Sequence, residues 1–490
     1  LYDHDFVDRW CYGFEELREH VQPFTPEYAE ATTWVPAERI RKAARILAAS
    51  KPATLQWGVA LDMTKEALPA GQAIMALFQV TGNVEVPGGI IVPPEILNYG
   101  GGWGFELLGD EQNEKRLGLD KYSLFRLGFQ AAHPNTTIEA MKTGKPYPIK
   151  AAWVQTSNFL ACMSANSTEV AECFRKLDFV AGADLFMTPT IMAFYDVVLP
   201  AAMWVEREGA FGNGERRTAV FPERDGVRLG DGAQRAEAIN KVCQVGECKS
   251  DMEMNLELGR RLAPEAWPWE NVEDMFTEMI ATSGITFPER REAAPVYLPF
   301  EYKKHEKGLL RPDGSPGFYT ATGRIELWST YYQNAGLDPL PVFDEPSPGP
   351  LATPELLDEY PLVLCTGARR WPFFHSEHRQ AKRLLAMHPD PWIEIHPETC
   401  ARLGVADGDW VWVENMLGRA KRRVKETPIF DPRIVAADHG WWNPEGDPEN
   451  LYDIGDLCIN NLIPWGNGKS GFGGNYKTNL CKVYKMKEGE

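Results

Sequence analysis

The chain has 490 residues and a mass of 55.1 kDa, which indicates roughly three domains of about 150 residues each. Apolar residues make up 44%, charged residues 24% and aromatic residues 11% of the chain, a composition that excludes long disordered and fibrous classes. The 51 basic side chains are outnumbered by 69 acidic ones, which gives a net charge of −18. This charge disfavours binding to nucleic acid or to an anionic membrane, so we expect no nucleic-acid partner.

The sequence carries no signal for membrane insertion or for disulfides. No apolar run approaches the roughly 20 residues that span a bilayer, so we expect no direct membrane insertion. The first ten residues, LYDHDFVDRW, are neither a methionine start nor a signal peptide, and we expect the chain to be a fragment. The nine cysteines are odd in number and contain no CxxC pair, which predicts buried thiols rather than a disulfide framework, a zinc site or a cluster site.

The first region combines helices with one expected strand. Residues 25–50 show helical periodicity, which stops at a Lys-Pro pair, and residues 53–61 (ATLQWGVAL) have the pattern of a strand. We expect another helix at about 65–80, because a Thr-Gly-Asn turn follows it. The irregular stretch at 93–148 marks the first domain boundary.

The clearest alternation of strands and helices begins at the strand AAWVQ, which is followed by polar residues up to Asn158. A helix is expected to begin at Asn166, because Glu169 stands three residues later as in a capping box. The next strand, DFVAGA, ends in Asp184, a further helix begins at Thr188, and DVVLPA forms a third strand. This order predicts a doubly wound parallel sheet, whose ligands bind beyond the carboxyl ends of the strands, near Asn158 and Asp184.

The last region has a different pattern. A proline-rich linker at 344–353 precedes it, and DGDWVWVEN and AKRRVKET alternate with period two around a turn at 417–419. We therefore predict an α/β fold of doubly wound parallel-sheet domains, followed by a C-terminal β-barrel-like domain. The domains are expected at 1–95, 96–345 and 346–490.

Common cofactor motifs are missing from the sequence. Gly468-Lys469-Ser470 is not a P-loop, because Ile463 stands where that motif needs glycine, and no GxGxxG follows a strand. His375 and His378 have HxxH spacing without the glutamate of a zinc protease, so we predict no metal site there.

The segment AAMWVEREGAFGNGERRT at 201–218 has two equally supported interpretations. It forms either a solvated surface turn, or a loop whose glycines bring backbone N–H groups near an anion while arginines bind phosphate. The residues concerned are Arg207, Gly209, Gly212, Gly214, Arg216 and Arg217.

Three further motifs are ambiguous from the residues alone. The paired arginines after the strand PLVLC stand before several aromatic residues, and we favour ligand contact over a packed strand end because buried arginines need anions nearby. Trp441 and Trp442 are more often core residues than a cofactor platform. Asp251 is either an ordinary acid at a helix N-terminus or a carboxylate that reads the edge of guanine.

Together, segments spread over nearly the whole chain resemble the molybdopterin oxidoreductases of the dimethyl sulfoxide reductase superfamily. The resemblance is carried, in this order, by FVDRWCYGFEEL, TPEYAEATTWVPAERIRKAARILA, VTGNVEVPGG, DFVAGADLFMTPTIMAFYDVVLPAAMWVEREGAFGNGERR, ATGRIELWS and ETCARLGVADGDWVWVENMLGRA. It implies a molybdenum or tungsten atom held by two molybdopterin guanine dinucleotides, with dinucleotide-binding crevices in both α/β domains and a molybdopterin dinucleotide-binding barrel at 346–490. HGWWNPEG and NYKTNLCKVYKM look like the branch that contains acetylene hydratase and anaerobic reductases and dehydroxylases.

The resemblance also implies roles for individual residues. One dinucleotide is expected to contact a first group, in which Asp251 reads guanine: Thr156, Asn158, Ala183, Asp184, Arg207 and Asp251. The other dinucleotide is expected to contact Trp57, Gly58 and Leu61. A shell around both pterins is expected to contain Thr366, Gly367, Arg369, Arg370, His375, Ser376, Trp442, Asn460 or Asn461, and Lys477.

The chain also departs from the family pattern. Members usually carry an N-terminal domain with an iron-sulfur cluster on four cysteines, followed by the residue that ligates the metal, and neither region matches here. We therefore assign no catalytic residue and no metal ligand, expect the iron-sulfur cluster only in the missing region, and expect this chain alone to be inactive. Substrate and compartment, whether prokaryotic cytoplasm or periplasm, stay open.

Three functions follow from the resemblance. The favoured one is a two-electron oxidoreductase acting on a small molecule, with an iron-sulfur subunit as an expected electron-transfer partner. The second is a hydratase that uses the same cofactor without net redox change. The third is a structural subunit that lost the cofactor, and the arginines and Asp251 at nucleotide positions argue against it, since buried charges would lose their partners.

Overall fold

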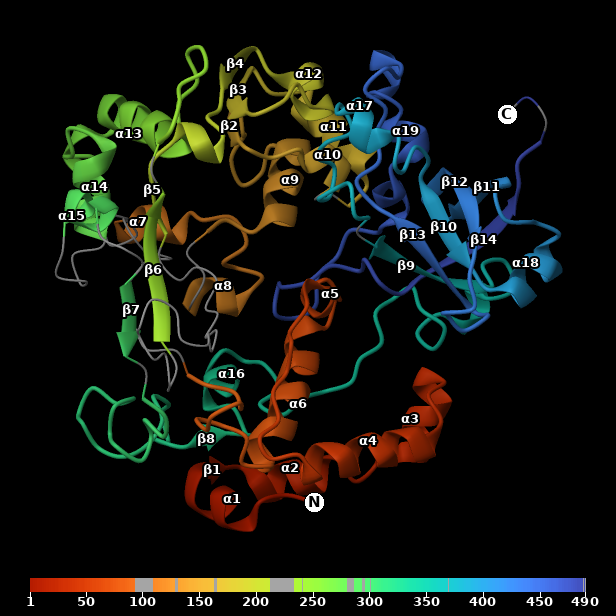
Figure 1. Cartoon of the computed structure of the whole chain (residues 1–490). Helices are drawn as coiled ribbons and strands as arrows, with labels where there is room; N and C mark the ends of the chain where they lie inside the picture. The colour runs from red at the N-terminus through yellow and green to blue at the C-terminus, as the bar shows by residue number, and fades with distance from the viewer. Residues whose placement is uncertain are drawn as a thin grey trace. The chain divides into compact units, whose positions relative to one another are not determined.

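The computed structural model shows two compact units, which are described separately (Figure 1). Unit 1 contains Leu1–Trp57, Pro69–Lys115 and Pro200–Val342, and unit 2 contains Gly58–Leu68, Arg116–Leu199 and Phe343–Glu490. The structure describes residues 1–92, 109–127, 131–162, 165–211, 233–239, 241–279, 286–292, 296–299, 301–368, 370–487 and 489. The predicted division into three domains stays a prediction.

Unit 1 is mainly helical and carries two small sheets. Its helices are α1 (His4–Trp10), α2 (Phe14–His20), α3 (Pro26–Thr33), α4 (Ala37–Ala49), α6 (Ala67–Val80, from Pro69 on), α7 (Asp110–Glu114), α13 (Asp251–Leu262), α14 (Val272–Met279), α15 (Phe287–Glu292) and α16 (Thr330–Asn334). Its strands are β1 (Cys11–Tyr12), which pairs in parallel with β8 (Ile325–Glu326), and the antiparallel set β5 (Gly209–Phe211), β6 (Ala233–Ile239) and β7 (Val296–Pro299). Short 3-10 turns lie at Trp204–Glu206 and Pro264–Ala266.

The sequence predicted the helices of the first region better than its strand. The expected helices at 25–50 and 65–80 are present as α3, α4 and α6. The expected strand at 53–61 is wrong: no residue of 53–58 pairs in a ladder with the described part of the chain, and α5 (Val59–Asp62) occupies the rest. An apolar run becomes a strand only when a neighbouring strand accepts its backbone groups, and here the Ala53 N–H donates to the Asn83 side chain at 2.8 Å instead.

Unit 2 contains a three-stranded sheet with the order β2 (Ala151–Gln155), β3 (Phe179–Asp184) and β4 (Val197–Pro200, up to Leu199). β2 and β3 pair in parallel, as predicted. The helices along this segment are α8 (Ser123–Leu127), α9 (Pro134–Thr143), α10 (Phe159–Cys162), α11 (Ser167–Phe174) and α12 (Pro189–Phe194).

The predicted helix starts in this segment are confirmed. The Asn166 side chain accepts a hydrogen bond from the Glu169 N–H, and its amide donates back to the Glu169 carboxylate at 3.0 Å. The Thr188 hydroxyl accepts from the Ile191 N–H at the start of α12. These caps satisfy backbone donors that a helix start leaves unpaired. α12 is the first element after β3, whereas α11 follows the short helix α10.

The C-terminal part of unit 2 is a closed six-stranded barrel (teal to blue in Figure 1) with the order β10-β12-β11-β14-β9-β13. Its strands are β9 (Leu362–Ala368), β10 (Trp392–Ile395), β11 (Trp410–Asn415), β12 (Gly418–Glu426), β13 (Ile434–Asp438) and β14 (Asn479–Lys485). Its helical segments are α17 (Lys382–Leu385), α18 (Pro397–Leu403) and α19 (Ile454–Leu457), with 3-10 turns at Pro354–Leu356, Pro448–Asn450 and Ile459–Leu462.

Alternation along the barrel strands produces its core. In β11, Val411 and Val413 are fully buried, and in β12 every second residue from Ala420 to Val424 points inward. Closure pairs every strand on both edges, so the barrel leaves no open edge. The predicted fold class, α/β with parallel sheets followed by a C-terminal barrel, is thereby confirmed.

Candidate functional site

The carboxyl ends of β2 and β3 form one side of the candidate site in unit 2. Asn158 follows β2 and is only 9% exposed. Its side-chain oxygen accepts from the Thr190 hydroxyl at 2.7 Å, and its amide nitrogen donates to the Ser376 hydroxyl at 2.9 Å. Asp184 ends β3, and its carboxylate accepts from the Leu185 N–H at 2.7 Å. Asn158 therefore ties the strand end of the sheet to the segment that contains Ser376.

The backbone between these strand ends is constrained. Thr156 has φ +48°, in the left-handed region, a conformation that costs a non-glycine residue of the order of 1–3 kcal/mol. Its N–H donates to the carbonyl of Ala183 at 2.7 Å, and Ala183 is fully buried. This bond extends the β2–β3 ladder by one residue and fixes the turn that presents Asn158.

A second side of the site is made by residues 375–379 and 438–442. Nδ1 of His375 and Nε2 of His439 lie 2.6 Å apart, so one ring donates and the other accepts. Gly440 has φ +70°, and a Cβ at this position would lie 2.7 Å from the His375 carbonyl carbon. The indole N–H of Trp442 donates to the Ser376 carbonyl at 3.0 Å. Only glycine allows the two segments to approach this closely, and the approach brings the two histidines together.

Arg379 is hydrogen-bonded to both of these segments. Its side chain is 2% exposed and stacks between the rings of Phe373 and Trp441, at 4.2 and 4.0 Å from their centroids. Its Nε donates to the Gly440 carbonyl at 2.8 Å, and one terminal nitrogen donates to the His375 carbonyl at 3.2 Å. A buried guanidinium with carbonyl partners keeps its charge in a water-poor setting, where anions are attracted most strongly.

Asp438 is the main counter-charge of this region. Its carboxylate is 1% exposed and accepts from Arg370 Nε at 2.6 Å, from His388 Nε2 at 2.7 Å and from the Trp392 N–H at 3.0 Å. Burial alone would raise the pKa of Asp438, but the hydrogen bond from His388 and the charge of Arg370 outweigh it and lower the pKa. Arg370 also pairs with Glu394 at 3.0 Å. Arg370 thus has its anionic partners within the protein, and ligand contact through the arginine pair stays a prediction.

Buried positive charge nevertheless exceeds buried negative charge here. Arg422, on β12, is fully buried and donates to the carbonyls of Leu457 at 2.8 Å and Asp438 at 3.2 Å. Burial lowers the pKa of Arg379 to about 9 and that of Arg422 to about 10, which leaves both charged at neutral pH. One terminal nitrogen of Arg379 and Nε of Arg422 are buried without a hydrogen-bond partner in the described part of the chain. The arrangement therefore favours an anionic ligand nearby.

The end of β9 meets the segment before β14. The Thr366 hydroxyl donates to the Tyr476 carbonyl at 2.7 Å, and the Lys477 ammonium donates to the Thr366 carbonyl. Gly367 has φ +89°, and a Cβ there would meet the Lys477 ammonium at 2.5 Å. Three residues expected in one shell, Thr366, Gly367 and Lys477, are thus brought together.

The two candidate asparagines of the shell behave differently. The amide nitrogen of Asn461 donates to the carbonyls of Ile454 at 2.8 Å and Gly455 at 3.1 Å, whereas its side-chain oxygen is buried without a hydrogen-bond partner among the described residues. Asn460 is 2% exposed, and its amide nitrogen donates to no residue that the structure describes. A buried donor without an acceptor is rare in proteins, so Asn460 is the better candidate for a ligand contact.

Several expected site residues lie in unit 1. Trp57 is 41% exposed at the end of a segment of that unit. Arg207 follows Glu206, whose buried carboxylate accepts from the N–H groups of Met203 at 3.0 Å and Val245 at 2.9 Å. Asp251 is the first residue of α13, after the N-cap Ser250, and so occupies the position of an ordinary first-turn acid. The proposed guanine contact of Asp251 stays a prediction.

The remaining expected residues are only partly described. Gly58 and Leu61 lie at the start of unit 2, around α5. Arg369 lies outside the described residues, as do four members of the glycine-rich loop: Gly212, Gly214, Arg216 and Arg217. The two interpretations of that loop therefore stay open.

Sequence reasoning missed Asp438, Arg379 and Arg422. One signal was available: strict alternation in β12 places Arg422 on the same inward face as Ala420 and Val424. Nothing comparable marked Arg379, because its burial depends on rings that come from two separate loops.

The described residues contain neither a metal-binding cluster nor a membrane-spanning helix. Within these ranges no group of three or more His, Cys, Asp or Glu side chains is arranged to hold a metal ion. No helix among them combines the length and apolar character needed to cross a bilayer.

Two family models match the chain. The model for "Molybdopterin oxidoreductase" matches residues 42–255, and the model for "Molydopterin dinucleotide binding domain" matches residues 362–478. The second match covers five of the six barrel strands, all but β14, and the segments that contain Arg370, His375, Asp438 and Lys477. It indicates a cofactor of the molybdenum or tungsten pterin dinucleotide type.

The chain is also similar to characterised proteins. It is 31% identical to an acetylene hydratase of Syntrophotalea acetylenica, over 92% of this chain and 62% of the relative. It is 26% identical to a dopamine dehydroxylase of Eggerthella lenta, over 88% and 49%, and 25% identical to formate dehydrogenase H of Escherichia coli, over 90% and 59%. The solved structure of acetylene hydratase from Pelobacter acetylenicus matches with a TM-score of 0.83 and 28% identity, over 99% of this chain and 68% of that one. The chain thus spans 49 to 62% of the length of these curated relatives.

Proposed function

We propose, from the premise that this chain belongs to the molybdopterin oxidoreductase family, that it holds a molybdenum or tungsten bis(molybdopterin guanine dinucleotide) in an enzyme for two-electron conversion of a small molecule. The bound group would supply the redox chemistry at its metal, and the protein would supply binding, orientation and electrostatics. Relatives named as formate dehydrogenase and dopamine dehydroxylase support the redox assignment.

One observation carries the proposal: the surplus of buried positive charge around Arg379 and Arg422. A dinucleotide brings phosphate anions and pterin rings rich in hydrogen-bonding groups. The buried nitrogens that lack acceptors, in Arg379, Arg422 and Asn460, fit such a ligand. A barrel that had lost its cofactor would gain stability by losing these charges, so their presence supports a retained ligand.

The residues of unit 2 have three different roles in this proposal. Asn158 and Ser376 hold the strand end and the pterin shell in register through their 2.9 Å hydrogen bond. His375 and His439 share one hydrogen between two ring nitrogens, so the pair can keep or pass a proton at the edge of the shell. Arg370 is held by Asp438 and Glu394, which fixes its position before any ligand binds.

The proposed partners follow the family rather than a contact in this structure. We propose a small-molecule substrate and an iron-sulfur electron-transfer subunit, with no nucleic acid and no direct membrane insertion. An iron-sulfur cluster within the same protein and the inactivity of this chain alone stay predictions.

A hydratase without net redox change is the second candidate, because the acetylene hydratases match this chain in sequence and in structure. The two functions differ in their need for electrons. We expect the protein, purified anaerobically from the cells that make it, to oxidise reduced viologen dyes in the presence of its substrate. Addition of water to acetylene with no dye turnover would contradict the oxidoreductase assignment and favour the hydratase.

Asn460 allows a test of cofactor binding that is independent of activity. Asn460→Ala removes a donor that has no protein acceptor, so we expect an unchanged free energy of unfolding for cofactor-free protein and a several-fold lower content of guanine nucleotide. The matched control is Asn415→Ala: its amide donates to the Leu462 carbonyl at 2.8 Å and its oxygen accepts from Leu417 at 2.9 Å. The control should lose about 1–3 kcal/mol of stability and keep its nucleotide. Equal nucleotide content in Asn460→Ala and the unaltered protein would contradict the assignment of Asn460.

A further inference from the structure

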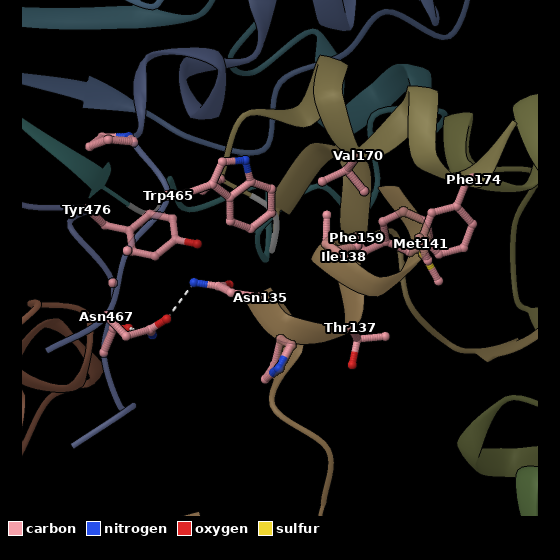
Figure 2. A pocket seen from close by; sticks show the side chains of 16 residues that line it. Asn135, Thr137, Ile138, Met141, Phe159, Val170, Phe174, Trp465, Asn467 and Tyr476 are labelled. Atoms are coloured by element: carbon pink, nitrogen blue, oxygen red, sulfur yellow. Dashed lines mark hydrogen bonds between the residues drawn. The ribbon is translucent and has the colours of Figure 1, made fainter. Parts of the chain in front are cut away.

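Unit 2 contains a cavity that the candidate site does not use. It encloses about 410 Å³ between α9, the described residues Phe159 and 165–174, and residues 464–476 (Figure 2). This volume is within the range of small-molecule sites in proteins. None of its lining residues is an expected cofactor residue, although Phe159 and Tyr476 are the chain neighbours of Asn158 and Lys477.

Aromatic side chains form most of the wall. Phe159 and Phe174 stand on one side, with ring centroids 4.4 Å apart, and Trp465 and Tyr476 stand on the other. Phe159, Trp465 and Tyr476 line the cavity, and each keeps a minor part of its surface uncovered. Large rings that are left partly uncovered inside a hollow are typical of sites for flat apolar molecules.

The other end of the cavity is polar but neutral. Figure 2 shows Asn135 and Asn467 facing each other, and the amide of Asn135 donates to the Asn467 oxygen. The Asn467 amide donates in turn to the Gly473 carbonyl. The side-chain oxygen of Asn135 accepts no hydrogen bond from the residues that the structure describes. One acceptor is therefore left at this end for a ligand that carries an O–H or N–H donor.

The lining excludes charged ligands. None of the described residues that line the cavity is Asp, Glu, Lys, Arg or His. Glu169, which contacts the lining residue Trp465, already accepts from its indole N–H at 2.7 Å and pairs with Lys142. Burial raises the pKa of Tyr476 to about 12, so its phenol stays neutral. A charged ligand would lose its hydration here without gaining a partner.

We infer that this cavity is a second binding site, distinct from the cofactor site, for a neutral aromatic molecule of one or two rings that carries a hydrogen-bond donor at one edge. The rings of the ligand pack between Phe159 and Phe174 on one side and Trp465 and Tyr476 on the other. Its donor reaches the free oxygen of Asn135. The inference does not rest on the proposed function, because no residue that it uses was assigned to the cofactor.

Three ligands with the same ring system test separately the roles of the rings, the hydrogen-bond donor and the absence of charge. 2-Naphthol has the donor, naphthalene lacks it, and 2-naphthoate carries a charge. In calorimetric titrations of the 490-residue chain we expect 2-naphthol to bind at one site per chain, with a Kd on the order of 100 µM for a ligand of this size. Naphthalene should bind about five- to tenfold more weakly, because it lacks one hydrogen bond. No binding should be seen with 2-naphthoate. Failure of 2-naphthol to bind, or equal binding of 2-naphthoate, would overturn the inference.

Variants place the ligand in this cavity. Asn135→Leu should weaken 2-naphthol about five- to tenfold and leave naphthalene unchanged. Ile138→Trp fills the cavity from α9 and should abolish binding of 2-naphthol and of naphthalene. If this variant fails to fold, Met141→Phe fills less of the cavity and should weaken the binding of both ligands. Glu139→Gln is the control, since Glu139 is exposed on the same helix and does not line the cavity. Unchanged binding in the filling variants, or an equal loss in the control, would refute the location.

Discussion

Asp438 is the residue whose loss should disturb the candidate site most. Asp438→Asn keeps the shape of the side chain and removes its charge. The unaltered carboxylate accepts from Arg370, His388 and Trp392 at 2.6, 2.7 and 3.0 Å. In the variant one of the two acceptor positions becomes an amide donor that faces other donors, and the buried guanidinium groups lose their shared counter-charge.

The expected magnitude follows from burial. Removing one partner of a buried charge pair typically costs about 3–5 kcal/mol, and asparagine keeps one acceptor, so we expect a loss of about 3 kcal/mol. Urea denaturation of the chain, followed by far-UV circular dichroism, measures this free energy of unfolding. The matched control is Asp431→Asn, because Asp431 pairs with Arg433 at 2.8 Å near the surface. An exposed pair of this kind contributes at most about 1 kcal/mol.

The effect should also depend on pH. The fold lowers the pKa of Asp438 below its ordinary value of 3.8, so its stabilisation is fully present above about pH 4 and is lost as the pH falls through the lowered value. The unaltered chain and Asp438→Asn should therefore differ most above pH 4 and converge below it. A loss under 1 kcal/mol at neutral pH, or a loss equal to that of Asp431→Asn, would refute the role given to this carboxylate.

Two further pairs of variants test one local feature in each unit. Gly440→Ala places a Cβ 2.7 Å from the His375 backbone and should lower the free energy of unfolding in urea by about 2–3 kcal/mol. The control Gly404→Ala has a similar φ of +67° with open space around the new Cβ, and should lower it by only about 1 kcal/mol. Equal losses in the two variants would refute the close approach at Gly440. In unit 1, Glu85 and Lys304 form an ion pair in which each side chain is at most 5% exposed. Glu85→Gln leaves the Lys304 ammonium buried without its counter-charge and should lower the free energy of unfolding by about 3 kcal/mol. The double variant Glu85→Gln/Lys304→Met also removes that buried charge and should recover most of the loss. Additive losses in the double variant would show that the buried pair is not coupled.

Local rules in the sequence predicted much of the fold. Asn166 and Thr188 cap helices by interactions within three residues, and alternation along β11 and β12 requires only neighbouring residues. The strand expected at 53–61 failed because pairing depends on a partner far away in the chain. Propensity alone does not supply that partner.

The candidate site was less accessible to sequence reasoning. The family resemblance assigned Asn158 to one dinucleotide and Ser376 and His375 to the shell around both pterins, and the structure joins Asn158 and Ser376 by a direct hydrogen bond. The sequence contains no indication that Arg379 and Asp438 are buried, because their surroundings come from loops that meet only after folding. Buried charge is a property of tertiary structure, which a linear pattern does not record.

The central claim is that this chain holds a metal-bound pterin dinucleotide. The most direct measurement is the content of molybdenum, tungsten and guanine nucleotide in the protein purified anaerobically from the cells that make it, by elemental analysis and by release of GMP on mild acid hydrolysis. The claim predicts one metal atom and about two GMP per protein, as the bis(dinucleotide) cofactor of the family requires. Well-folded protein with neither metal nor GMP would contradict it and favour a structural subunit that has lost its cofactor.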